Sequence, residues 1–297
     1  MLLNFYFFII QLQLPKYRKT HEAWVLLLVN HNLLPELRVK KENLIIAAVF
    51  PGPKPPKDLN SFLFPTMEQF VKLEKGVRTK KYDGTFFLLR VFILFFTGDL
   101  PGISKFLCFM GHNSYFGCRY CWLKGIYSKK HKHIYFVDSC GANREAPNRT
   151  IDELRSTVFQ LNNAAGNSSL VKSIRQASGI HGESILFQLT STKFPQSFPV
   201  DLMHLMINII KIMFQIWIGE IRPSVNAQPA YLISQANVQI IGEKMVRSSR
   251  GIPGSMGHAP RNIAIHWRGF KAEEWKLWAV LYSAPLLKDA NFPLLYL

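Results

Sequence analysis

The part of the sequence that decides the fold is residues 85–122, TFFLLRVFILFFTGDLPGISKFLCFMGHNSYFGCRYCW. From Phe86 to Phe96 it is apolar apart from Arg90, and the breaker residues TGDLP follow at 97–101. This pattern predicts a buried segment that delivers Asp99 to its carboxyl end. An unpaired buried carboxylate is costly, so we expect Asp99 either to cap a helix or turn or to be a metal ligand.

Two cysteines, Cys118 and Cys121, close the same stretch. The Cys-x-x-C spacing can place two thiolates on one zinc ion, which needs two further ligands. The nearby candidates are Cys108, His112, His131, His133 and Cys140, and none of them forms a second regular pair. A redox pair is the rival interpretation, but redox motifs of this kind begin a helix after a strand. We expect metal over redox chemistry, and two cysteines without a ligand remain an alternative.

The composition indicates a folded, strongly basic protein. The chain has 297 residues, 48% of them hydrophobic, and 36 Lys and Arg against 19 Asp and Glu give a net charge of +17. This charge predicts a polyanionic partner, with nucleic acid as the first expectation and an anionic membrane surface as the second. Basic residues concentrate at 16–19, at Lys80 and Lys81, at 129–133 and at 247–250. The candidate nucleic-acid contacts are Lys129, Lys130, Lys132, Arg247 and Arg250.

Cysteine usage and the apolar segments bear on the compartment. Four cysteines in a chain of this size do not make a disulfide scaffold, which indicates a reducing compartment. The apolar start, residues 1–14, has no preceding basic residue and no small-residue cleavage site, so we expect no secretion signal. Neither this segment nor 86–96 reaches the roughly 18 to 20 residues that a membrane span needs.

The first half of the chain is expected to contain both strands and helices. Apolar runs at 24–30 and 44–50 have strand length, and the prolines at 51–56 end the second run. Residues 58–76 predict a helix, which Asp58 caps and Gly76 ends. With the segment 86–96 as a further strand, the order predicts an α/β or α+β core.

The second half is expected to be mostly helical. Thr150 and Glu153 have capping-box spacing ahead of a helix, residues 162–169 are expected to form a loop, and 185–189 a strand. Helices are expected over 202–218, 231–246 and 272–287. In the last of these, Trp275, Trp278 and Tyr282 recur at helical spacing, which is typical of a core rather than of a base-stacking surface.

Asp201 and His204 begin the apolar helix expected at 202–218. One interpretation is a capping Asp with a partnered His, and the other is a polar cluster at a helix N-terminus that orients a metal ligand or contacts phosphate. The sequence has no phosphate-binding Gly-rich loop and no Ser-His-Asp signature, so nucleotide hydrolysis and acyl transfer find no support.

Several short motifs, taken in order, resemble one family. They are LLPELR at 33–38, NLII at 43–46, PGPKPP at 51–56, GDLP at 98–101, GHNS at 111–114, the Cys118 and Cys121 pair, DLMH at 201–204, APRNI at 259–263 and FKAEEW at 270–275. In this order they resemble the CACTA-type, Plavaka-like cut-and-paste transposases, over roughly residues 24–290.

The resemblance implies an RNase H-like core in which three carboxylates hold two divalent metal ions, Mg²⁺ or Mn²⁺, for phosphodiester cleavage and strand transfer. It implies that Asp99 is the second catalytic acid. Cys118 and Cys121 are then half of a structural zinc site that two later histidines complete. Asp201 and His204 match the family motif that follows the second acid.

The sequence also departs from the family pattern. The first acid would lie before Trp24, where residues 1–23 contain no Asp and only Glu22, and the third acid and the histidine pair would lie beyond Leu297. We therefore expect a fragment or degenerate copy that binds DNA without competent strand transfer. The alternatives are a nonenzymatic zinc-linked module that contacts nucleic acid or protein, and a membrane-surface protein.

The expected organisation has three parts. Residues 1–125 would form an incomplete RNase H-like core with the Cys-x-x-C pair, 126–184 a basic, loop-rich connection, and 185–297 a mostly helical insertion region. The expected partner is DNA, the protein could form a homo-oligomer, and no transmembrane span is expected. The resemblance favours the nucleus, with the cytoplasm second, and the protein is not expected to be secreted.

Overall fold

The computed structural model describes residues 2–13 by their backbone, and 22–52, 56, 58–136, 146–221, 229–290, 292 and 293. The basic cluster at 16–19 and Cys140 lie outside the described residues. The chain divides into two compact units, Met1–Asp201 and Leu202–Leu297. Each unit is described by itself below.

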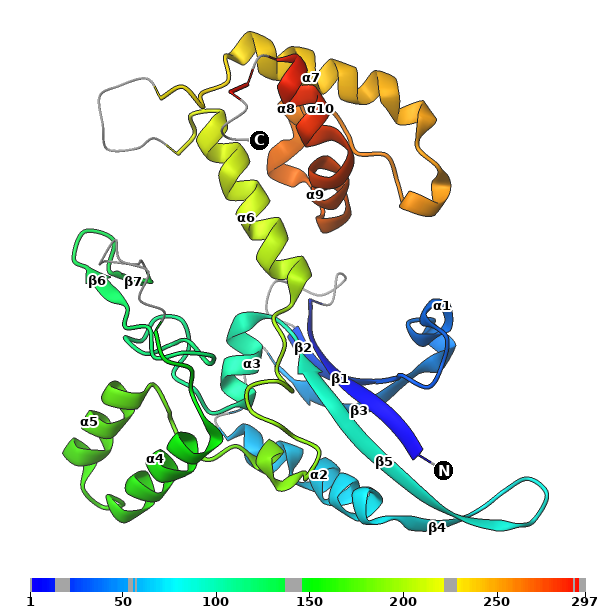
Figure 1. Ribbon diagram of the computed structural model, residues 1–297, viewed down its shortest axis with the longest axis vertical. Coiled ribbons are helices and arrows are strands. Elements are labelled where there is room, and N and C mark those ends of the chain that lie inside the picture. Colours follow the sequence, from blue (N-terminus) through cyan, green and yellow to red (C-terminus); the bar gives the residue numbers. More distant parts are fainter. Residues whose placement is uncertain are drawn as a thin grey trace. The chain divides into compact units, whose positions relative to one another are not determined.

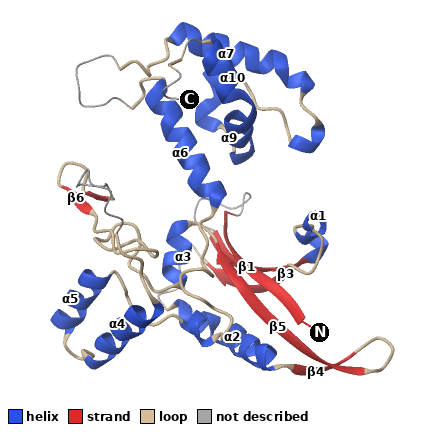
Figure 2. Cartoon of the chain, in the orientation of Figure 1, coloured by secondary structure: helices blue, strands red, loops and turns tan. Residues whose placement is uncertain are grey.

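A five-stranded sheet forms the centre of the first unit (Figures 1 and 2). Its strands are β1 (Leu2–Gln13), β2 (Glu22–Asn30), β3 (Leu44–Pro51), β4 (Val77–Lys80) and β5 (Phe86–Thr97), in the order β3-β2-β1-β5-β4. β5 runs parallel to β1, and the pairs β1–β2, β2–β3 and β4–β5 are antiparallel. The sheet and the helices around it confirm the expected mixed α and β class.

The first long helix begins and ends where the sequence predicts. The carboxylate of Asp58 accepts a hydrogen bond from the Ser61 amide and caps α2 (Leu59–Lys75). Gly76 ends the helix with φ of 107°, a conformation that glycine adopts without strain. A Cβ at this position would lie 2.9 Å from the side chain of Leu88 on β5, so the close approach of helix end and strand also requires glycine.

The core of the first unit lies between α2 and one face of the sheet. Leu63, Met67 and Phe70 recur at helical spacing on α2 and are buried, and they share one cluster with Val91 and Ile93 of β5. The apolar segment from 86 to 96 is therefore a strand with one buried face, as predicted.

The rest of the first unit is built from short elements. They are α1 (Pro35–Arg38), η1 (Lys41–Asn43), α3 (Leu100–Phe106), the hairpin of β6 (Ile126–Ser128) and β7 (His133–Tyr135), α4 (Ile151–Asn163), α5 (Ser168–Ser178) and η2 (Ile185–Gln188). The predicted capping box is present, because the Thr150 hydroxyl accepts from the Glu153 amide and the Glu153 carboxylate accepts from the Thr150 amide.

Two expectations for this region are wrong. Residues 162–169 are not a loop throughout, because α4 continues to Asn163 and the Asn167 side chain caps α5. Residues 185–189 form a 3₁₀ turn rather than a strand, because the Ser184 hydroxyl accepts from the Leu186 amide and closes the turn locally.

The second unit is helical. It contains α6 (Leu202–Trp217), α7 (Gln235–Ser248), η3 (Ser249–Gly251), η4 (Gly254–Met256), α8 (Ile263–His266), η5 (Trp267–Gly269), α9 (Ala272–Leu277), the π-helical segment η6 (Trp278–Tyr282) and α10 (Ser283–Asp289). The helix expected at 231–246 begins later, at Gln235, where Ser234 caps it. No helix in the described ranges is long and apolar enough to cross a membrane.

Aromatic side chains form the core of the second unit, as expected. Trp275 and Trp278 are 2% and 0% exposed, and both rings pack against Phe214 of α6 with centroids 5.8 and 5.7 Å away. The single helix predicted over 272–287 is instead an α–π–α succession. Pro285 has no amide hydrogen to donate to the preceding turn, which interrupts the regular α-helical ladder next to the π segment.

Candidate functional site

Asp99 stands two residues after the end of β5 and caps α3. Its carboxylate Oδ1 accepts a hydrogen bond of 2.6 Å from the Gly102 amide, and its carbonyl accepts one of 3.0 Å from the Ile103 amide. A Cβ on Gly102 would lie 2.6 Å from the same Oδ1, so a larger residue here would displace the capping carboxylate. Of the two interpretations of Asp99, the structure therefore shows the cap, which uses one of the two carboxylate oxygens.

Replacing Asp99 with alanine is expected to destabilise the first unit by about 1 kcal/mol, because the Gly102 amide loses its acceptor. Asparagine also caps well, so Asp99→Asn is expected to stay within about 0.3 kcal/mol of the unchanged protein. Urea unfolding, with hydrogen exchange of the α3 amides, measures both variants. Equal losses in the two variants would contradict a role as a neutral cap and would assign the effect to the carboxylate charge.

Cys118 and Cys121 lie in a loop between α3 and β6, not at the start of a helix. Their Sγ atoms are 3.4 Å apart, and the Tyr120 amide donates to the Cys118 Sγ at 3.4 Å. A disulfide needs about 2.05 Å between sulfurs. Two thiolates bound to one tetrahedral zinc at about 2.3 Å each lie about 3.8 Å apart. The pair is therefore free in the structure, at a spacing close to that of a metal knuckle.

Arg149 holds the cysteine loop from a position 28 residues beyond Cys121. It is 3% exposed, its Nε donates to the Cys118 carbonyl at 2.8 Å and to the Cys121 carbonyl at 3.3 Å, and its Nη2 donates to the Phe116 carbonyl at 2.9 Å. The guanidinium carbon lies 3.9 Å from the centre of the Trp122 ring. This side chain fixes the backbone on both sides of the two thiols.

Burial shifts the pKa values of Arg149 and Cys121 in this loop. Burial lowers the pKa of Arg149, and the neighbouring Cys118 and Cys121 oppose that shift. Burial raises the pKa of Cys121, which a hydrogen bond from the Leu123 backbone partly offsets. The Nη1 of Arg149 is buried and has no hydrogen-bond partner among the described residues. The positive charge of Arg149 opposes the rise in the Cys121 pKa but does not cancel it.

The two residues between the cysteines tie the loop to the segment before Asp201. Arg119 is 6% exposed, and it donates from Nε to the Phe198 carbonyl and from Nη2 to the Pro199 carbonyl, each at 3.1 Å. The Tyr120 hydroxyl also donates to the Phe198 carbonyl. Residues about 80 positions apart in the sequence are joined here.

The same segment contacts the end of β5. The Phe96 amide donates to the Ser197 carbonyl at 2.7 Å, and the Phe96 and Phe198 rings stack with centroids 5.2 Å apart. The structure thus brings together the strand end that leads to Asp99, the cysteine loop and the approach to Asp201. Asp201 is half-buried at the end of the first unit, and His204 is exposed in the first turn of α6 in the second unit.

The basic residues singled out from the sequence lie at two exposed places. Lys129, Lys130 and Lys132 are exposed at the turn of the β6–β7 hairpin, where Lys132 has φ of 51°. Arg247, at the end of α7, is 3.8 Å from Glu243, and Arg250 is in η3. The first group belongs to the first unit and the second group to the second.

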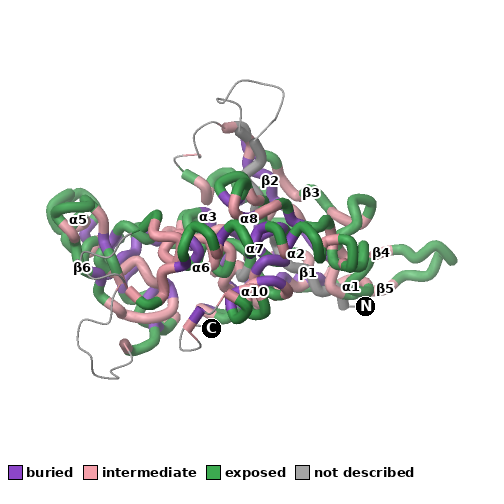
Figure 3. The backbone as a smooth tube through the Cα atoms, turned by 90° about the horizontal axis from the view of Figure 1, so that it is seen from above, coloured by how far each residue is buried: buried purple, intermediate pink, exposed green. Residues whose placement is uncertain are grey.

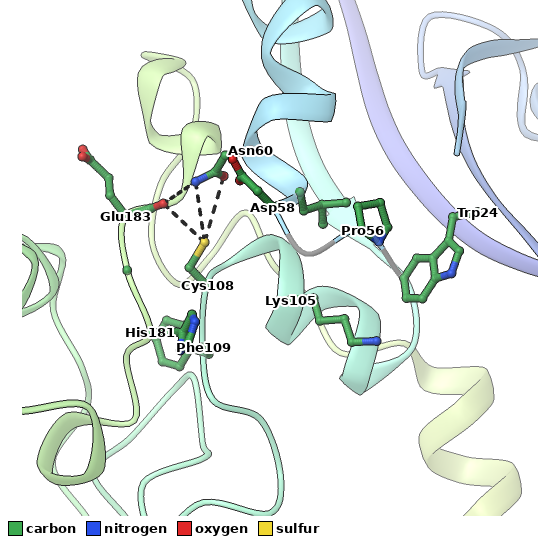
Figure 4. Close-up of a pocket in the computed structure, with 11 residues that line it drawn as sticks. Trp24, Pro56, Asp58, Asn60, Lys105, Cys108, Phe109, His181 and Glu183 are labelled. Atoms are coloured by element: carbon green, nitrogen blue, oxygen red, sulfur yellow. Dashed lines mark hydrogen bonds between the residues drawn. The ribbon is translucent and has the colours of Figure 1, made fainter. Parts of the chain in front are cut away.

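Cys108 does not join the cysteine pair. It lines a pocket of about 440 Å³ with Trp24 and Lys105, and its Sγ donates to the Glu183 carbonyl at 3.3 Å (Figure 4). Burial raises the pKa of Cys108 to about 11, so its thiol stays protonated at neutral pH. The side-chain amide of Asn60 also donates to the Glu183 carbonyl, which closes this side of the pocket.

The histidines named as ligand candidates lie apart from Cys118 and Cys121. His112 and His133 have ring centroids 6.0 Å apart, and His131 is hydrogen-bonded to the Tyr135 hydroxyl at 3.2 Å. Within the described ranges, no three His, Cys, Asp or Glu side chains lie close enough to hold one metal ion.

Sequence reasoning missed the two arginines that organise this site. Arg149 was visible only as part of an Asn-Arg-Thr pattern, and Arg119 only as a spacer between cysteines. An arginine inside the cysteine motif was the available signal for Arg119. Nothing in the spacing pointed to Arg149.

Residues 14–156 match the family model described as "Transposase family tnp2". The matched range covers most of the sheet and contains Asp99, Cys118, Cys121 and Arg149. No curated protein matches the chain. Over these residues, the match supports the transposase part of the resemblance and a transposase-related function. The CACTA-type, Plavaka-like assignment stays a prediction.

Proposed function

We propose that the chain is a transposase-derived DNA-binding protein of the CACTA-type, Plavaka-like group, related to cut-and-paste transposition, and that the first unit is an RNase H-like core. The observation that carries the proposal is the family match over residues 14–156. The topology supports it, because a three-stranded antiparallel meander is followed by the helix α2 and by β5, which runs parallel to β1. Asp99 follows β5.

The proposal about catalysis rests on the residues of β1, the strand that runs parallel to β5. A two-metal site needs carboxylates on adjacent elements, and the metal ions, Mg²⁺ or Mn²⁺, would activate the attacking oxygen and stabilise the leaving one. β1 contains no Asp or Glu, and its pairing places Phe8 beside Thr97, two residues before Asp99. Asp99 would serve as the second acid of the family without a carboxylate on the neighbouring strand. We therefore propose that this chain binds DNA without transferring strands.

Incubating the chain with terminal-repeat DNA and Mg²⁺ or Mn²⁺ tests this proposal. The expected result is no nicking above a protein-free control. Metal-dependent nicking that Asp99→Ala abolishes would overturn it.

We also propose that Cys118 and Cys121 hold one structural zinc ion and that Arg149 keeps their loop in the binding conformation. Support comes from the 3.4 Å separation of the sulfurs and the three carbonyls that Arg149 binds. These two thiols would fill half of a tetrahedral site. Metal analysis of purified protein is expected to find zinc, and Cys118→Ser is expected to remove it. Zinc retained by Cys118→Ser would contradict the assignment.

A nonenzymatic zinc-linked interaction module is the second candidate function. It is favoured by the cysteine pair in a loop that is anchored by buried arginines. Duplex binding separates the two candidates. A DNA-binding protein with this net charge is expected to bind at low salt and to lose affinity steeply as salt rises. Phosphate contacts are strong at about 50 mM NaCl. A protein that contains zinc but binds no duplex DNA at this salt concentration would favour the module.

Two further expectations rest on the same proposal. A DNA-binding function favours the nucleus, and imaging of the tagged chain checks it. A homo-oligomer is compatible with a transposase ancestry, and sedimentation of the purified chain measures it.

A further inference from the structure

The β4–β5 hairpin projects from the sheet of the first unit. Its tip lies away from the other labelled elements of that unit in two perpendicular views (Figures 1 and 3). Residues 77–90 carry four cationic side chains and one acidic side chain. The cations are Arg78, Lys80, Lys81 and Arg90, and all four are exposed.

Strand pairing places three of these cations on one face. Arg78 pairs with Leu88 and Lys80 with Phe86, and directly opposite residues of an antiparallel pair share a face. Arg90 follows Leu88 by two positions and so points to the same side. These five residues form the basic ribbon face. All of them are exposed, and no acidic residue is among them.

The other face of the hairpin meets the protein core at Leu89. Phe87 and Leu89 are half-buried, and Leu89 packs against the core cluster that contains Val91. The hairpin is thus anchored on one side and open on the other. The guanidinium of Arg78 lies 4.2 Å from the centre of the Phe86 ring, so cation and aromatic ring form one surface.

The turn adds a cation and an aromatic ring at the tip. Residues 81–84 form a turn closed by a hydrogen bond from the Gly84 amide to the Lys81 carbonyl, and Tyr82 is fully exposed. The acidic residue, Asp83, accepts hydrogen bonds from the amide and hydroxyl of Thr85, at 2.9 and 2.6 Å. Its carboxylate is therefore engaged within the turn and is not among the residues of the basic ribbon face.

We propose that the basic ribbon face, with Lys81 and Tyr82 at the tip, is the surface through which this chain contacts duplex DNA. The inference rests on the proposed DNA-binding function and names the element that carries it. A two-stranded ribbon has the width to enter the major groove of B-DNA, and arginine and lysine on one face can meet the phosphates that border the groove.

Protection of a sheet edge is the competing explanation for these charges. β4 is an edge strand, and lysines on an edge strand prevent pairing with other chains. Edge protection accounts for Arg78 and Lys80 alone. It does not account for Arg90, which lies on the inner strand β5, or for an exposed tyrosine at the tip. A polyanion in contact with one face accounts for all of them.

Fluorescence anisotropy of a labelled 30-base-pair duplex, a length of about three helical turns, tests the proposal across a salt series. The test variant combines Arg78→Gln, Lys80→Gln, Lys81→Gln and Arg90→Gln. The matched control combines Lys40→Gln, Lys41→Gln, Arg155→Gln and Lys172→Gln, which are exposed residues of the same unit and remove the same charge. Both variants change only exposed side chains, and circular dichroism checks their folding.

The hairpin variant is expected to bind duplex DNA at least about tenfold more weakly. The slope of the logarithm of its binding constant against the logarithm of the salt concentration is expected to fall in magnitude by about 3 to 4, because each lost phosphate contact lowers it by about 0.9. The control is expected to stay within about threefold. Tyr82→Ala is expected to weaken binding with an unchanged slope, because a ring releases no counterions. In the unaltered protein, photo-cross-linking to bromodeoxyuridine-substituted duplex is expected to label residues 78–90.

The outcomes separate this inference from the proposed function. If the unaltered chain binds DNA and the two quadruple variants lose affinity equally, the assignment of the basic ribbon face is wrong, while the proposed DNA-binding function is unaffected. No duplex binding by the unaltered chain would overturn both. A hairpin-dependent interaction with anionic phospholipid vesicles, without one with DNA, would replace the partner and overturn the inference.

Discussion

Replacing Arg149 with methionine is expected to destabilise the first unit by about 2–4 kcal/mol, because hydrogen bonds that involve a charged group are worth about 1.5–3 kcal/mol and their loss leaves acceptors unpaired. Methionine has a similar length but donates no hydrogen bonds. The carbonyls of Cys118, Cys121 and Phe116 would each lose a donor in a half-buried loop. The stacking on Trp122 would also be lost.

Two further variants make the Arg149 prediction specific. Arg155→Met, six residues later in α4, changes a side chain that is 70% exposed and is expected to shift stability by less than about 0.5 kcal/mol. Arg149→Lys keeps the charge but not the planar set of donors, and is expected to recover only part of the loss. Urea unfolding measures stability, and metal analysis measures zinc. Unfolding of Arg149→Met at the same urea concentration as the unchanged protein would contradict the role of Arg149 in holding the cysteine loop.

Replacing Glu74 with alanine is expected to destabilise the first unit by about 2–3 kcal/mol, because hydrogen bonds to a charged acceptor are worth about 1.5–3 kcal/mol and the lost donors stay partly buried. Glu74 is 8% exposed at the end of α2. Its carboxylate accepts from the amide and hydroxyl of Thr190, at 2.7 and 2.8 Å, and from the amide and hydroxyl of Ser191. This one side chain holds the segment after η2 against α2.

The same helix supplies the control for Glu74. Glu68 is 50% exposed and pairs with Lys72 at 3.0 Å, so Glu68→Ala is expected to cost less than about 0.5 kcal/mol. Glu74→Gln keeps one acceptor oxygen and is expected to fall between alanine and the unchanged protein. Urea unfolding of the three variants gives the comparison. Equal effects of Glu68→Ala and Glu74→Ala would show that the bonds to Thr190 and Ser191 contribute nothing.

Predictions that rest on neighbouring residues agree with the structure. The helix at 59–75 follows from the Asp58 cap, the apolar spacing and Gly76 at its end. The capping box at Thr150 and the strand at 86–97 follow in the same way. The strand predicted at 185–189 is wrong because its apolar residues serve a turn that Ser184 closes, and an apolar run alone does not distinguish the two.

The candidate site was predictable only in part. Asp99 and the cysteine pair are visible as residue types at a stated spacing, and both interpretations of Asp99 could be written down in advance. The choice of the cap needed the 2.6 Å bond to the Gly102 amide. The anchoring of the cysteine loop by Arg119 and Arg149 joins segments 28 to 80 residues apart, for which local patterns carry no information.

The sequence by itself determined the elements and the total charge, because capping, helical spacing, turn residues and composition act over a few neighbouring positions. The tertiary structure alone decided which residues meet. Strand pairing put Arg78, Lys80 and Arg90 on one face of a hairpin, and chain packing buried Arg149 behind the cysteines. The reason is physical: burial and strand register depend on contacts between distant segments, and these contacts form only when the whole unit folds.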